Sequence, residues 1–309
     1  MMTDKCWKRL WIGIGLVCAI VGVVLFASSS SPSPTDLAGK SLAKVVSADA
    51  AANKLTIQPA DPSRPALAVP SEFAGTIAKS VGLDDSVWYT TGSDGKTINA
   101  VGLKQTEMSW TRATGAVLVA FALVWGGVLL VTCGHPWVFA LGVDGRISNS
   151  QTQLYLWFML FATIYLTEIV VRTYYTGYFG GIGAPAKLLA LSGISALTFG
   201  AARANATLKD GAAKTPPPSD RTRLNLLLDL FTSDSPTDKN GRRSLGDFQM
   251  IVLTGAAIAV YLVTSIIWVT KLAWASHVDL PPVDDTLLGG TAASQGAYLF
   301  KKIASPAGH

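Results

Sequence analysis

The sequence predicts an α-helical polytopic membrane protein with five or six transmembrane helices, a parallel internal repeat and a small extracytoplasmic all-β domain. Three observations lead to this prediction: several long uncharged runs, a segment of short β-type runs, and a motif that recurs 96 residues later. Half of the 309 residues are hydrophobic, 15% are charged, and the mean hydropathy is +0.37. Soluble domains carry about 25% charged residues, so the composition excludes a freely soluble protein.

Four runs are long enough to cross a bilayer, which takes about 17–25 mostly apolar residues. Glu168 is the only charged residue within them. Two shorter runs of 15 residues each, 188–202 and 286–300, would cover about 22 Å as helices. Flanking Lys and Arg side chains can extend such short spans by reaching the interface, but the last run leaves the count at five or six. The four long runs are 10–27, 115–131, 154–171 and 250–270.

Basic residues set the predicted orientation, because cytoplasmic loops of membrane proteins are enriched in Lys and Arg. Segment 203–249 holds eight of them, whereas 172–187 holds two and 271–285 holds one. With six spans, both termini and every basic cluster are cytoplasmic, and residues 28–110 lie outside. The first run has 18 residues, longer than the 7–15 of a cleaved signal peptide, so an uncleaved anchor is favoured over cleavage near Ala27.

The predicted organisation has seven parts. In chain order they are a cytoplasmic N-terminus, a transmembrane anchor, an extracytoplasmic linker with a β domain, a transmembrane helix, a first repeat unit with two spans, a cytoplasmic loop with an amphipathic helix, and a second repeat unit. Their residues are 1–9, 10–27, 28–110, 111–132, 133–203, 204–240 and 241–309.

The extracytoplasmic part contains five short β-type runs separated by turn residues. Asp94 followed by Gly95 is a strong hairpin signal before the last run. A helical stretch with Phe73, Ile77 and Val81 at four-residue spacing lies between the third and fourth runs, with Ser71 placed to cap it and Gly82 to end it. This order is that of an OB-fold, although other small barrels share it. The runs are 41–47, 54–58, 66–69, 87–90 and 97–103.

Nucleic-acid binding, a frequent function of OB-folds, is not expected for this domain. Residues 28–110 carry seven Lys and Arg against eight Asp and Glu, whereas single-strand binding needs a basic groove with stacking platforms. The basic cytoplasmic loops are instead suited to anionic lipid. The predicted partners are therefore membrane lipids, other subunits of a membrane complex, or a second copy in a homo-oligomer.

An internal duplication is indicated by the alignment of residues 145–171 with 241–267, which gives six identities in 27 positions. Both units begin on the predicted cytoplasmic side, so the repeat is parallel. Ser148 with Gln151, and Ser244 with Asp247, fit the spacing of a capping box. A capped helix start explains most of the shared motif without a ligand.

The motif GRISNSQTQL, followed by LGDFQM and SQGAYLFKK, resembles a recurrent bacterial integral-membrane module over about 145–303. That module has no established activity. The resemblance implies a bacterial cytoplasmic (inner) membrane location and no particular chemistry.

Glu168 and Arg172 form the candidate intramembrane polar site or ion pair. Ionisable residues within a span are functional candidates by default, but a pair four residues apart near a helix end is also an ordinary surface ion pair. The functional interpretation makes the protein a channel or transporter in which Glu168 acts with Ser192, Ser195 and Ser294.

The cytoplasmic loop contains a candidate partner or interfacial helix after three consecutive prolines. Two arginines are followed there by apolar residues at helical spacing. This pattern is typical of helices that lie on a membrane surface or dock onto a partner protein. Packing onto the protein's own spans is the alternative. The residues are Arg221, Arg223, Leu224, Leu227, Leu228 and Phe231.

No catalytic, cofactor or metal site is predicted. The three histidines fall on opposite sides of the membrane or in a tail, and Cys133 lacks further ligands for a metal. Phosphate-binding loops and nucleophile elbows are not found in the sequence. The predicted function is therefore a non-catalytic integral membrane scaffold, anchor or accessory subunit of a larger bacterial assembly, with the channel or transporter as the alternative.

Overall fold

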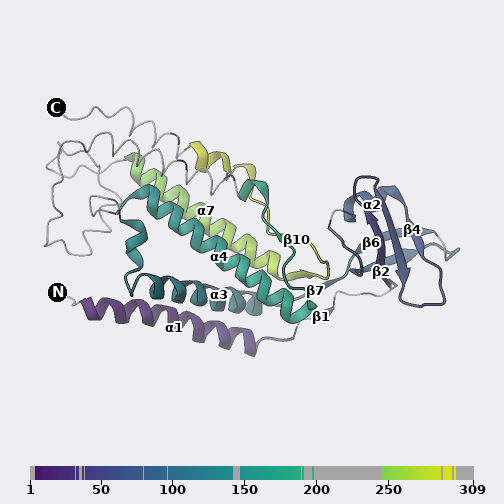
Figure 1. Ribbon diagram of the computed structural model, residues 1–309, viewed down its shortest axis with the longest axis horizontal. Coiled ribbons are helices and arrows are strands. Elements are labelled where there is room, and N and C mark those ends of the chain that lie inside the picture. The colour runs from purple at the N-terminus through teal and green to yellow at the C-terminus, as the bar shows by residue number, and fades with distance from the viewer. Residues whose placement is uncertain are drawn as a thin grey trace.

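Four long helices lie side by side in the computed structural model, and a small β domain sits at one end of them (Figure 1). The helices are α1 (Asp4–Ser28), α3 (Trp110–Val131), α4 (Asn149–Thr176) and α7 (Leu245–Val269). All four are long and apolar enough to cross a membrane, which confirms the four long helices expected from the apolar runs. The structure describes residues 4–31, 33–34, 37, 39–78, 80–95, 97–141, 147–188, 190, 197, 245–286, 288–293 and 296.

Several predictions fall outside those residues. The loop 204–240, with its candidate helix from Arg221 to Phe231, is wholly outside them, and so are Ser192, Ser195 and Ser294. The two short runs 188–202 and 286–300 are described only in part. Whether these runs cross the membrane stays a prediction.

One end of each long helix lies against the β domain, and we call this the domain-side end and the other the far end. Strand β1 (Ser33–Pro34) follows α1, β7 (Gln105–Glu107) precedes α3, and β9 (Lys271–Ala273) follows α7. These strands form one sheet in the order β1-β7-β9. Strand β8 (Ile182–Gly183), after α4, pairs in parallel with β10 (Val278–Asp279). The four helices therefore share one boundary.

The β domain has the five strands and the intervening helix predicted from the sequence. Its antiparallel sheet has the order β4-β3-β2-β5-β6. The central strand has a bulge between Val45 and Ser47. It pairs with β5 from Ser41 to Lys44 and with β3 from Ala43 to Asp49. The elements are β2 (Ser41–Asp49), β3 (Lys54–Pro59), β4 (Leu67–Val69), α2 (Ser71–Ile77), β5 (Ser86–Thr91) and β6 (Ile98–Leu103).

The core of this domain follows from the alternation of side chains along its strands. Leu55 and Ile57 on β3 and Val87 and Tyr89 on β5 are all at most 2% exposed. Ile77 of α2 packs onto this core. The hairpin predicted at Asp94 and Gly95 joins β5 to β6. In its turn, Gly95 adopts a φ of +67° and the Asp94 carboxylate accepts a hydrogen bond from the Thr97 amide.

The capping prediction at Ser71 is wrong, and the one at Ser148 is confirmed in position but not in its side-chain bond. Pro70, not Ser71, is the residue that precedes the first turn of α2, and it makes no side-chain cap bond. Ser148 is the N-cap of α4, but its hydroxyl makes no cap bond and lies 3.2 Å from the Ser150 hydroxyl instead. Serine hydroxyls readily take such local partners in place of the capping amide.

Helix α1 packs on α3 through small residues. Gly22 is the one buried residue among positions 8–28. A Cβ at Gly22 would lie 2.9 Å from the Gly115 oxygen, and one at Gly115 would lie 2.6 Å from the Phe26 nitrogen. Close backbone approach through small residues is the usual packing of helices in membranes. The remaining faces of α1 expose nine large apolar side chains, which suits a lipid environment.

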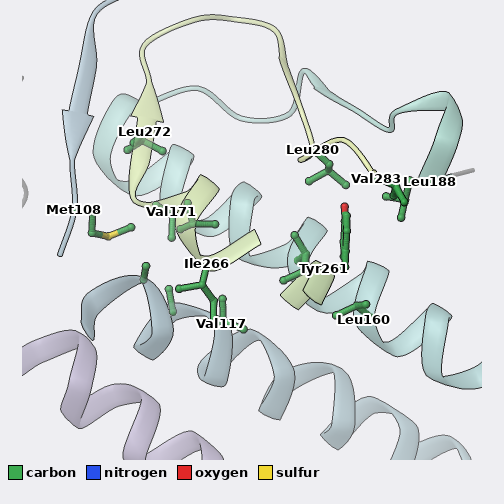
Figure 2. Close-up of a cluster of buried hydrophobic side chains, with 14 of the residues drawn as sticks. Met108, Val117, Leu160, Val171, Leu188, Tyr261, Ile266, Leu272, Leu280 and Val283 are labelled. Atoms are coloured by element: carbon green, nitrogen blue, oxygen red, sulfur yellow. The ribbon is translucent and has the colours of Figure 1, made fainter. Parts of the chain in front are cut away.

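Helix α4 lies between α3 and α7 and buries the largest share of the four helices. Figure 2 shows the apolar cluster that these helices share, in which Leu160 and Val171 of α4 lie near Tyr261 and Ile266 of α7 and Val117 of α3. This cluster is the core of the helical part.

Helices α4 and α7 begin 96 residues apart, and the strands that follow them pair at the same offset, with Ile182 opposite Val278. Equivalent side chains nevertheless have opposite environments. Trp157 is 1% exposed and its counterpart Leu253 is 36% exposed, and Ile164 is fully buried where Val260 is 52% exposed. The positions that α4 buries against its neighbouring helices therefore correspond, 96 residues later, to positions that α7 exposes.

Candidate functional site at the junction of helices and domain

A cluster of three buried charged side chains and two half-buried hydroxyl groups lies where the β domain meets the domain-side end of the helices. It consists of Asp85 from the loop before β5, Glu168 and Arg172 from the last turns of α4, Tyr178 from the turn after α4, and Ser276 from the segment between β9 and β10. We call these five residues the junction.

Arg172 holds the segments that follow α4 and α7 together. Its side chain is 1% exposed, and one terminal nitrogen donates to the Gly180 oxygen at 2.8 Å. The other donates to the Ala275 oxygen at 2.5 Å and reaches the Ser276 oxygen at 3.5 Å. These carbonyls lie outside the helices and strands, where no regular pattern of backbone hydrogen bonds supplies a donor. The guanidinium of Arg172 supplies the donors instead.

Asp85 joins the β domain to the helical part. It is fully buried, and one carboxylate oxygen accepts from the Gly82 amide at 2.7 Å, the Ser276 amide at 2.7 Å and the Ser276 hydroxyl at 3.0 Å. A Cβ at Gly82 would collide with the Ser276 hydroxyl. Gly82 therefore permits this close approach; it does not end α2, which stops at Ile77, so its prediction as a helix end is wrong.

Tyr178 lies beside the same carboxylate. Burial of the phenol raises its pKa to about 12, and the nearby negative charge of Asp85 acts in the same direction, against the positive charge of Arg172. Tyr178 is therefore neutral at physiological pH. Its hydroxyl adds a polar group to the junction without adding charge.

Glu168 lies one helical turn before Arg172 and is 3% exposed. Within the described part of the chain, no hydrogen bond reaches its carboxyl group. The nearby hydroxyls of Thr163 and Thr167 donate to the carbonyls of their own helix, four residues back. On α7, the Tyr261 hydroxyl is within range of the Glu168 charge but donates to the Pro281 oxygen at 3.2 Å.

A second set of contacts flanks the junction. The Trp274 indole donates to the Thr106 hydroxyl at 2.7 Å, and the Trp274 amide donates to the Lys104 oxygen at 2.8 Å. The Lys104 ammonium lies 3.8 Å from the centre of the Trp274 ring, a favourable cation–π contact. The Met108 amide donates to the Thr270 oxygen at 2.9 Å. The β domain is thus attached to the end of α7 over several consecutive residues.

The sequence pointed to Glu168 and Arg172, and both lie in the junction. It gave no sign of Asp85, Tyr178 or Ser276. A signal for Asp85 was present in the sequence. A buried arginine near a helix end needs an anion, and the adjacent acidic residues Asp84 and Asp85, just before the fourth predicted strand, could have supplied it. The sequence could not show which anion would meet Arg172.

At the far end, Gln153 connects α4 to α7. It is 1% exposed, and its amide nitrogen donates to the Thr254 hydroxyl at 2.6 Å. Polar bonds of this kind hold helices together in an apolar environment.

Comparison of the chain with models of protein families, with curated proteins and with solved structures finds no match.

Proposed function

We propose that this protein is a non-catalytic membrane scaffold or accessory subunit that presents its β domain in a fixed orientation to other subunits of a bacterial membrane assembly. The observation that carries the proposal is the bonding of Asp85 to Ser276, beside the Arg172 contacts to Gly180 and Ala275. Domains within one chain move relative to each other unless their interface is large and apolar. A domain that only needed a tether would not require buried charged contacts at its base.

We further propose that the β domain is extracytoplasmic and that the far end faces the cytoplasm of a bacterial cell. The distribution of Lys and Arg in the sequence supports this orientation. The resemblance of residues 145–303 to a bacterial membrane module supports the location. Aromatic contacts near both ends of the helices are also in favour, since Trp and Tyr prefer membrane interfaces: Trp11 meets Trp125 and Trp137, and Phe26 meets Tyr174 and Tyr175.

The finer architecture is also a proposal. The sheet order β4-β3-β2-β5-β6, with α2 between β4 and β5, supports an OB-like domain. The common offset of 96 residues between the helix starts and between Ile182 and Val278 supports a duplicated unit.

A channel or transporter is the second candidate, and Glu168 is the observation that favours it. A carboxyl group that is 3% exposed within a span is typical of ion or proton pathways. Flux through protein reconstituted in vesicles, lost in Glu168→Gln while assembly is retained, would support this candidate over the scaffold.

The scaffold proposal is tested by the mass of the gently solubilised native complex, with every co-migrating chain identified. We expect a discrete assembly with other subunits. The Asp85→Ala variant should release subunits that contact the β domain, whereas Asp61→Ala, in an exposed turn of the same domain, should retain them. A monomer or a pure homo-oligomer in the wild type would overturn the proposal.

A further inference from the structure

We propose that Glu168 is a proton-binding site in the membrane-spanning part of the protein, with an uncharged carboxyl group at neutral pH, and that Asp85 is the anion that balances Arg172. This inference goes beyond the scaffold role and does not depend on it. It follows from the charges and the hydrogen bonds of the junction.

The junction buries one cation and two acidic groups. Arg172 is 1% exposed, Asp85 is fully buried, and Glu168 is 3% exposed. A buried charge without a partner is costly in an apolar medium. One carboxylate neutralises Arg172, so the second acidic group is most stable when it keeps its proton.

Hydrogen bonds identify which acid is charged. Asp85 receives three donors on one oxygen, from the Gly82 amide and from the amide and hydroxyl of Ser276. Donors aimed at a carboxylate favour its ionised form. Glu168 receives no donor from the described residues, and the terminal nitrogens of Arg172 are directed at carbonyl oxygens instead. Asp85 is therefore the anion and Glu168 the neutral acid.

The other groups around Glu168 leave this assignment unchanged. On its own helix, Arg172 is the charged neighbour. On α7, Tyr261 is neutral and donates to the Pro281 oxygen. Beyond Arg172 lie Asp85 and the neutral Tyr178. If Glu168 lost its proton, two anions would share one cation. Proton release at Glu168 therefore places a second negative charge near Arg172, in competition with Asp85, whose hydrogen bonds to Ser276 attach the β domain.

A hydrophobic carbodiimide tests the assignment, because it modifies protonated carboxyl groups in apolar sites. The acid proton moves to a nitrogen of dicyclohexylcarbodiimide, and the carboxyl oxygen bonds to the central carbon. The O-acylisourea then rearranges to a stable N-acylurea that retains every atom of the reagent. The full-length protein in phospholipid vesicles is treated at about pH 7, and the labelled residue is found by peptide mass spectrometry.

We expect labelling at Glu168, no labelling at Asp85, and no labelled peptide from this helix in Glu168→Gln. In Asp85→Asn, Glu168 must become the partner of Arg172, so its labelling should fall by about tenfold or more, the change expected when a nearby opposite charge stabilises the ionised acid. The matched variant Asp61→Asn should label like the wild type.

Wild-type protein in which Glu168 stays unlabelled, or in which Asp85 is labelled instead, overturns the proposal. Equal labelling of Glu168 in the wild type and in Asp85→Asn overturns the charge balance. Infrared spectroscopy gives a second measurement that needs no reagent: the carbonyl stretch of a protonated carboxylic acid should be present in the wild type and absent in Glu168→Gln. None of these results depends on a partner subunit, so they are separate from the test of the scaffold.

Discussion

At the scale of single residues, the junction shows how buried charges are accommodated where a helix reaches the end of the apolar region. Arg172 and Asp85 are both at most 1% exposed, and together they make six hydrogen bonds to backbone and hydroxyl groups of Gly82, Gly180, Ala275 and Ser276. Buried ions are tolerated when each has both an opposite charge and satisfied hydrogen bonds. Removal of either partner should therefore be costly.

The Asp85→Ala variant should unfold at a clearly lower temperature than the wild type. It removes the negative charge near Arg172 and leaves the Gly82 and Ser276 amides without their acceptor. A buried donor left without a partner costs about 1–3 kcal/mol. Thermal unfolding in detergent micelles measures the shift. Asp61→Ala is the control, because Asp61 bonds within its own exposed turn. Equal unfolding temperatures for the two variants would contradict the role given to Asp85.

Tyr178 should make the protein sensitive to alkali. Its pKa is raised to about 12 in the folded protein by burial and by Asp85, above the ordinary value near 10. A group with a raised pKa contributes stability that is present below its unfolded pKa and is lost as pH rises through its folded pKa. The wild type should therefore lose more stability between about pH 10 and 12 than Tyr178→Phe. Unfolding temperatures across that range measure the difference, and parallel curves would refute it.

At the scale of elements, the contact between α1 and α3 depends on the absence of side chains. Gly22 and Gly115 face each other so closely that a Cβ on either would contact backbone atoms at under 3.0 Å. Apolar side chains elsewhere on α1 do not specify this partner, because lipid tails are as apolar as another helix. The glycines set where the two helices meet.

Gly22→Leu should separate α1 from α3 and lower the unfolding temperature in detergent, since overpacking costs about 1–3 kcal/mol. Gly13→Leu is the matched control on the same helix, because a Cβ there would meet nothing within 4 Å. Leucine is a better helix former than glycine, so the control should unfold at or above the wild-type temperature. A loss of the same size in both variants would show that helix propensity, not packing, is responsible.

Helices α4 and α7, which the proposed repeat aligns, show how position determines which residues can be charged. Arg172 of α4 is 1% exposed, and its counterpart on α7 is Trp268, which is 38% exposed. The counterpart of Glu168 is Thr264. A charge on an apolar outer face would have to enter lipid at high cost. The polar site is therefore confined to the unit whose face is covered by protein.

At the scale of the whole molecule, the four helices end at one boundary and the β domain stands on it (Figure 1). The three-stranded sheet, the pairing of β8 with β10 and the junction all lie at that end. The Cys133 side chain is exposed and follows α3 at the far end. The two ends can therefore be distinguished by chemical labelling.

A membrane-impermeant maleimide added to intact bacterial cells should label Ala50→Cys, in the turn after β2, and leave Cys133 unlabelled. Both positions are exposed in the structure, so the membrane alone would account for the difference. Permeabilised cells are the control, because both cysteines should then react. Labelling of Cys133 in intact cells, with Ala50→Cys protected, would reverse the proposed orientation.

The sequence by itself determined the secondary-structure elements, because these depend on residues that are close together in the chain. The lengths of four apolar runs predicted α1, α3, α4 and α7. The alternation of side chains with turn residues predicted the five strands and the hairpin at Gly95, and a four-residue spacing predicted α2. These patterns are local, because run length and period are set within each element. Capping bonds at Ser71 and Ser148 were also expected from local spacing and are not formed. Pro70 takes the N-cap position of α2, and the Ser148 hydroxyl lies beside that of Ser150 instead.

Only the tertiary structure decided how these elements meet. Asp85, Arg172 and Ser276 belong to segments far apart in the chain, and their hydrogen bonds depend on how three irregular segments come together at one boundary. The sequence also could not show that α4 is enclosed while the equivalent face of α7 is open. In a soluble protein the apolar face of a helix identifies its core side. In a membrane, lipid and protein neighbours are equally apolar, so only the packed structure separates one face from the other.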